Sequence, residues 1–73
     1  MPKLFSARQV IKALGRAGFV VVSQKGSHIK LKGINQGKIC TVIIPNHKEI
    51  ARGTFISILK QAEMSQLELE KYV

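Results

Sequence analysis

Two histidines are the side chains of this sequence best suited to proton transfer near neutral pH. His28 is followed at alternate positions by Lys30 and Lys32, so in an extended strand all three side chains leave the same face. An imidazole there could act as a general acid or base, and the ammonium groups could hold a phosphate. The alternation therefore indicates phosphodiester chemistry on an open strand face. The simpler alternative is a surface histidine on a basic strand.

The sequence offers few other groups that could carry such a reaction. It has no Asp for a Ser-His-Asp triad, and its single cysteine, Cys40, lies in an apolar stretch typical of a core. Glu49 is the only carboxylate side chain before residue 63, which is too few for a two-metal site. We therefore expect no metal and no cofactor. RNA supplies its own nucleophile, the 2′-hydroxyl, so histidine and a cationic phosphate site meet the minimum for cleaving it.

The charge of the chain also favours an anionic partner. Its 73 residues carry 12 Lys and Arg against 4 Glu, a formal net charge of +8, and all but one of those Glu residues fall after residue 62. The basic body should attract nucleic acid above all, with an anionic membrane surface or an acidic protein as alternatives. The 3 Phe and 1 Tyr are too few for a sheet that stacks bases, so contacts to backbone and 2′-hydroxyl groups fit better.

Two capping boxes and an apolar stripe predict the helices. Ser6 and Gln9 form a capping box in front of apolar residues spaced three and four apart, and Gly18 follows where this helix should end. A second helix is expected to open at residues 53–54. Another capping box, which begins at Ser65, predicts a short acidic helix near the C-terminus.

The segment between the two main helices predicts three strands. Residues 19–24 are rich in β-branched side chains, residues 27–32 alternate strictly, and residues 38–44 run up to Pro45. Residues 33–37 indicate a hairpin loop. The short spacings between these strands favour antiparallel pairing of neighbours.

This order of elements predicts an α+β fold in a single domain over residues 1–73, with a three-stranded antiparallel sheet and helices on one face. In the middle strand, Ser27, Ile29 and Leu31 would face the helices and leave the His28 face open. No apolar stretch approaches the roughly 20 residues of a membrane span, and the N-terminus lacks the apolar region of a signal peptide. We therefore expect a cytoplasmic protein.

Three further features leave more than one interpretation open. His47, in a polar loop, is a candidate second proton carrier or phosphate ligand, or only an exposed loop residue. The amides at 53–54 could bind a phosphate or simply begin a helix. A basic ridge on the first helix could attract RNA or only keep that helix solvated; it comprises Arg8, Lys12 and Arg16.

Four segments of the chain, in order, resemble the HicA-type toxins, the small ribonucleases of HicA–HicB toxin–antitoxin pairs. Each motif alone is weak, but the four together at these distances are specific and run through most of the chain. Residues 10–14 with 17–19 resemble the first helix of the family and its entry into the first strand, and residues 53–54 with 58–62 resemble its last main helix. Between them, Lys25-Gly26-Ser27-His28 resembles a Gly-Ser-His signature, and Ile44-Pro45-Asn46-His47 resembles a Pro-x-His segment.

The resemblance implies a fold similar to double-stranded RNA-binding domains, α-β-β-β-α, and an activity that cleaves mRNA. It also implies that His28 is the catalytic residue and that a HicB-type antitoxin covers the active surface. Operator DNA would then be bound only indirectly, through the antitoxin. Five more residues are expected to bind the RNA or its phosphates: Lys25, Ser27, Lys30, Lys32 and His47.

The chain departs from the family pattern in two places. The family commonly has Gly after the Gln-Ala of its last main helix, where this chain has Glu63. The resemblance also implies nothing about the acidic end at 68–72.

Two rival functions also fit the charge. One is a non-catalytic RNA-binding module of the same fold, and the other is an interaction protein whose basic surface receives an acidic partner.

Overall fold

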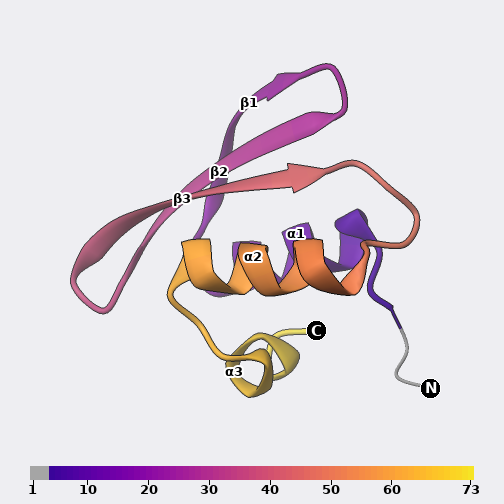
Figure 1. Ribbon diagram of the computed structural model, residues 1–73. Coiled ribbons are helices and arrows are strands. Elements are labelled where there is room, and N and C mark those ends of the chain that lie inside the picture. The colour runs from indigo at the N-terminus through magenta and orange to yellow at the C-terminus, as the bar shows by residue number, and fades with distance from the viewer. Residues whose placement is uncertain (1–3) are drawn as a thin grey trace.

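The computed structural model describes residues 4–73, which form one antiparallel sheet with helices on one of its faces (Figure 1). The elements are α1 (Ala7–Arg16), β1 (Val20–Lys25), β2 (His28–Asn35), β3 (Lys38–Pro45), α2 (Arg52–Ala62) and α3 (Gln66–Glu70). The strand order is β1-β2-β3, and α3 lies on the side of α1 and α2 that faces away from the sheet. The predicted α+β fold is confirmed. No helix in residues 4–73 has the length and apolar character needed to cross a membrane.

Side-chain caps explain where two of the helices begin. The Ser6 hydroxyl accepts a hydrogen bond from the Gln9 amide at 3.1 Å, while the Gln9 side chain accepts one from the Ser6 amide at 2.9 Å. Gly18, with a φ of 104°, adopts the left-handed conformation just past the end of α1. An equivalent box between Ser65 and Glu68 starts α3. Both predicted capping boxes are confirmed.

The start of α2 differs from the prediction. The helix begins at Arg52, and its N-cap is Ala51, which makes no side-chain capping bond. The entry to the helix is anchored instead by the preceding Ile50, whose side chain is buried. The helix thus begins one residue before the predicted start, and neither Gly53 nor Thr54 is its N-cap, since both lie inside its first turn.

The first hairpin turns on two residues. Lys25 pairs with His28, so Gly26 and Ser27 form the turn between β1 and β2, and Gly26 has a φ of 60°. Glycine at the first central position suits a type II′ turn, whose twist matches that of the flanking strands. Ser27 is therefore an exposed turn residue, and its expected place on the helix-facing side of the strand is wrong.

The second hairpin also turns on two residues, which lengthens β2 beyond the prediction. Asn35 pairs with Lys38, and the turn consists of Gln36 with a φ of 53° and Gly37 with a φ of 74°. Two successive residues with positive φ are typical of a type I′ turn. The predicted loop over 33–37 is therefore wrong, since pairing continues up to the turn itself.

The core lies between the helices and the helix-facing side of β2 and β3. Ile29 and Leu31 alternate into it from β2, whereas β1 is exposed along its whole length. Cys40 is buried in this core, as predicted. The largest fully buried side chains are Val10, Leu14, Leu31, Val42, Ile44, Ile50, Ile58 and Leu69.

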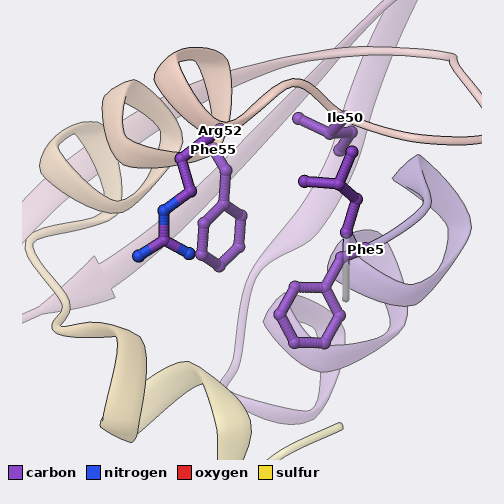
Figure 2. A pocket seen from close by; sticks show the side chains of 5 residues that line it. Phe5, Ile50, Arg52 and Phe55 are labelled. Carbon is purple, nitrogen blue, oxygen red and sulfur yellow. The ribbon is translucent and has the colours of Figure 1, made fainter. Parts of the chain in front are cut away.

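Ile50 closes the core where the chain enters α1 and α2 (Figure 2). Its amide donates a hydrogen bond to the Phe5 carbonyl at 2.8 Å. The Phe5 and Phe55 rings lie nearby, with their centroids 5.2 Å apart, and Figure 2 shows the Arg52 side chain beside Phe55. These contacts tie the loop after β3 to the segment before α1.

Phe19 packs over Gly33 in β2. The Phe19 side chain is 3% exposed, and a Cβ added to Gly33 would lie 2.6 Å from its ring. The φ of Gly33 is not positive, so lack of space, and not backbone conformation, demands glycine here.

Candidate active site

His28 opens β2 and lies on the sheet face that the helices leave free. Its side chain and those of Lys30 and Lys32 are exposed, whereas Ile29 and Leu31 between them are buried. The alternation expected for this segment is therefore confirmed. It presents an imidazole and two ammonium groups on one open surface, which we call the open face.

The strand register ranks the lysines by their distance from His28. Lys25 is its direct cross-strand partner in β1, an arrangement that places two Cβ atoms about 5 Å apart. Lys30 lies two residues further along β2, which corresponds to roughly 7 Å, and Lys32 lies four residues along, roughly 13 Å. Lys25 and Lys30 can therefore reach a phosphate at His28, whereas Lys32 is better placed for a neighbouring phosphate.

No acidic side chain pairs with this cluster within the described residues. The ion pair found in residues 4–73 joins Lys38 to Glu63 at 3.7 Å, at the opposite end of the sheet. Lys25, His28 and Lys30 are exposed. Their side chains are therefore free to meet an anion that arrives from solvent.

Neither a presented thiol nor a metal-binding cluster accompanies His28 in the part of the chain that the structure describes. The Cys40 side chain is only 5% exposed and belongs to the core. Residues 4–73 contain no group of three or more His, Cys, Asp or Glu side chains that could hold a metal ion. The open-face side chains themselves can offer proton transfer by imidazole and stabilisation of negative charge by ammonium groups.

His47 lies in the loop between β3 and α2. It lines a hollow beside the start of α1, and the other residues that line this hollow are Ser6, Arg8, Asn46 and Lys48. The His47 carbonyl accepts a hydrogen bond from the Ala7 amide at 3.0 Å, which holds the loop against the helix. His47 is therefore not one of the alternating side chains of β2, although it follows Pro45, the cross-strand partner of His28, by two residues.

Ser27, the remaining predicted site residue, lies in the turn directly before His28. Its carbonyl accepts a hydrogen bond from the Asn46 amide at 2.7 Å. The segment that carries His47 is therefore attached by its main chain to the turn that carries His28.

The basic ridge of α1 is divided between two surroundings. Arg8 lines the hollow with His47, whereas Lys12 and Arg16 lie near the C-terminal residues. There the Arg16 Nη1 atom donates a hydrogen bond to the Tyr72 carbonyl at 2.8 Å. The three side chains of the ridge are exposed, and its two ends thus have different neighbours.

The open face becomes apolar away from His28. Ile34 and Ile39 are cross-strand partners that are 70% and 76% exposed, and Val20 is 61% exposed. The sequence does not reveal this patch, because its pattern predicts a loop at residue 34, which in fact belongs to β2. The alternation along β3, where Ile39 precedes the buried Cys40, could have revealed part of it. We call Val20, Ile34 and Ile39 the apolar end.

Comparison with known proteins places the chain in a family. A search of curated protein sequences finds no relative that matches it. A family model described as the HicA toxin of bacterial toxin–antitoxin pairs matches residues 7–64, well over half of the 73-residue chain. The matched part runs from α1 through α2 and includes both histidines. The chain therefore belongs to the HicA toxin family and is the toxin of a toxin–antitoxin pair.

Proposed function

We propose that this toxin is an endoribonuclease that cleaves mRNA, with His28 as general acid or base and without a metal ion. One observation carries the proposal: the exposed His28 side chain lies beside Lys25 and Lys30, with no acidic partner in the described chain. A phosphate bound there would meet cationic groups and a proton-transfer group together. Membership of the HicA family supports the proposal, because toxins of this family are generally of the RNase type.

In the proposed reaction, the 2′-oxygen of the RNA attacks the adjacent phosphorus, and the bond from phosphorus to the 5′-oxygen breaks. The proton of the 2′-hydroxyl passes to a base, and the leaving 5′-oxygen takes up a proton. His28 performs one of these two transfers, while Lys25 and Lys30 stabilise the charge that develops on the phosphoryl oxygens. This step leaves a 2′,3′-cyclic phosphate on one fragment and a 5′-hydroxyl on the other, and a water molecule that then opens the cyclic ester by breaking its bond to the 2′-oxygen leaves a 3′-phosphate.

In this proposal, the other residues expected to bind RNA contact parts of the strand other than the scissile phosphate. Lys32, further along β2, holds a neighbouring phosphate. Ser27 offers its exposed hydroxyl beside His28. His47, which lines the hollow at α1, serves as a phosphate ligand there.

We also propose that the protein partner is a HicB-type antitoxin, met in the cytoplasm, and that operator DNA is bound only through it. The apolar end supports a protein partner, because exposed apolar patches commonly mark protein contacts and RNA backbone binding does not need them. The apolar end and His28 share the open face. An antitoxin seated on the apolar end would thus cover the catalytic end as well.

Replacement of His28 tests the catalytic proposal. The His28→Ala variant should cleave RNA about 10²–10⁴-fold more slowly, because it lacks the acid–base group. Its far-UV circular dichroism and Tm should stay unchanged, since the native side chain is exposed. Time courses on purified RNA, with identification of the product ends, measure the effect. Lys71→Gln, which alters an exposed residue at the end of α3, is the control.

The same assay separates the proposal from its rivals. A correctly folded His28→Ala protein that cleaves RNA at the wild-type rate would overturn the assignment. A wild-type protein that binds RNA without breaking it over time would identify a non-catalytic RNA-binding module. A protein that neither binds nor cuts RNA but captures an acidic partner would identify an interaction protein.

A further inference from the structure

The hollow beside the start of α1 has the composition of an anion site. Of the residues that line it, Arg8, His47 and Lys48 are cationic or can become so, and none is acidic. All three are exposed, so their charged ends are accessible from solvent. The acid nearest in sequence, Glu49, does not line the hollow.

The main chain holds both walls of this hollow in place. On one side, the Ala7 amide donates to the His47 carbonyl at 3.0 Å, and on the other the Ile50 amide donates to the Phe5 carbonyl at 2.8 Å. The Ile50 side chain is buried, which fixes the far end of the loop. A loop held at both ends presents Lys48 with less loss of conformational entropy on binding than a free loop would.

The side chains, and not the helix terminus, supply the attraction. The amides of Ser6 and Gln9 are already engaged in the capping box, and the Ala7 amide is engaged by His47. The first turn of α1 thus has few free donors to offer. The guanidinium of Arg8 and the ammonium of Lys48 make no ion pair within residues 4–73. Guanidinium groups match the geometry of phosphate oxygens especially well.

We infer that this hollow binds a phosphate of the RNA strand beyond the scissile one, with Arg8 and Lys48 as ligands beside His47. The inference rests on the proposed function, since it takes RNA as the substrate. The bond from the Asn46 amide to the Ser27 carbonyl places the hollow at the His28 end of the sheet, where the continuing strand would pass.

The composition of the hollow favours an RNA backbone over a protein segment as its occupant. Its lining contains no apolar side chain, whereas protein interfaces are built around an apolar core. Two of the most exposed apolar residues of the open face, Ile34 and Ile39, lie at the opposite end of the sheet, while Ile43 lies across from Lys30. Cationic and polar side chains without an apolar residue among them are typical of phosphate-backbone contacts.

Binding measurements on protein that cannot cleave test this inference. In the His28→Ala background, fluorescence anisotropy with an oligouridine gives the Kd at several salt concentrations. Arg8→Gln and Lys48→Gln should each raise the Kd roughly three- to tenfold and should lower the slope of log Kd against log salt by about 0.7. Lys71→Gln, which removes the same charge at the C-cap of α3, should change neither quantity measurably, because α3 lies on the side of α1 and α2 that faces away from the sheet (Figure 1).

The outcomes distinguish this inference from the proposed function. If Arg8→Gln and Lys48→Gln weaken RNA binding no more than Lys71→Gln does, the hollow is not an RNA subsite, even though wild-type protein still cleaves RNA. If they leave RNA binding intact but weaken binding of the antitoxin, the hollow belongs to the protein partner and the inference is overturned. If the His28→Ala protein and wild type both fail to bind RNA, the proposed function and the inference fail together.

Discussion

The carbonyl oxygen of Ser27 accepts a hydrogen bond from the amide of Asn46 at 2.7 Å. This bond extends the β2–β3 pairing one step past the pair formed by His28 and Pro45. His28 directly follows Ser27, and His47 directly follows Asn46. The Gly-Ser-His and Pro-x-His segments, which are distant in sequence, are thus joined through the main chain, and side-chain replacements can probe either one without breaking this connection.

The lysines beside His28 should contribute to cleavage in an order set by the strand register. Lys25→Gln should have the largest effect, at least about tenfold on kcat, because Lys25 is the direct cross-strand partner of His28. Lys30→Gln should have a smaller effect, and Lys32→Gln should raise KM more than it lowers kcat, since Lys32 lies further along β2. Steady-state kinetics on one RNA substrate measure the three variants. Equal effects on kcat would contradict this order.

Cleavage should not require a dissociable metal ion. Glu49 is the only carboxylate side chain in residues 1–62, and a hard divalent cation such as Mg²⁺ is held mainly by oxygen ligands. We expect the rate in excess EDTA to match the rate in buffer without chelator at the same ionic strength. Loss of activity in EDTA that returns on addition of Mg²⁺ or Mn²⁺ would contradict the metal-independent mechanism.

Substitution of two glycines by alanine should have opposite effects on stability. Gly33→Ala should lower the free energy of unfolding by about 1–3 kcal/mol, because the new Cβ would clash with the ring of Phe19. Gly15→Ala should raise it by about 1 kcal/mol, because Gly15 lies in α1 with open space around it. Urea unfolding followed by circular dichroism measures both changes. Destabilisation by both substitutions would show that the Phe19 contact is not the cause.

Glycine at position 63 should stabilise the protein. Glu63 is the C-cap of α2 and has a φ of 57°, a conformation that costs a residue with a Cβ about 1 kcal/mol. Glu63→Gly should therefore raise the Tm by a few degrees, even though it removes the exposed ion pair with Lys38, which stabilises by at most about 1 kcal/mol. Glu63→Ala is the control, since it loses the ion pair but keeps the Cβ. A higher Tm for the alanine variant than for the glycine variant would refute the backbone explanation.

The short helix α3 should be an integral part of the folded chain, although it lies outside the segment that matches the family model. Leu69 is fully buried, so Leu69→Ala should lower the free energy of unfolding by about 2–5 kcal/mol. Leu67 in the same helix is 73% exposed, so Leu67→Ala should change it by less than about 0.5 kcal/mol. Similar effects of the two substitutions in urea titrations would mean that α3 does not pack as described.

Local patterns predicted the parts of the fold that depend on local energetics. The capping box at Ser6 and the alternation of His28 with Ile29 could be recognised because hydrogen bonds and burial there involve residues a few positions apart. The turn at Gln36 could not, because a glutamine with positive φ carries no composition signal. The burial of Ile50 and Leu69 could not be predicted either, because Ile50 lies in a polar loop and Leu69 shares its short helix with the exposed Leu67, so that distant partners decide which side chain is buried.

The sequence by itself determined the order of the elements, the α+β fold and the face on which His28 is presented, because periodicity within one strand decides which side chains face the core. Only the tertiary structure decided that Lys25 is the lysine paired with His28, that Ser27 belongs to a turn and that His47 lines a separate hollow. The place of His47 depends on hydrogen bonds between segments far apart in the chain, such as the bond from the Asn46 amide to the Ser27 carbonyl. The pairing of Lys25 with His28 and the place of Ser27 depend on the exact position of the hairpin turn, which the alternation along a single strand does not decide.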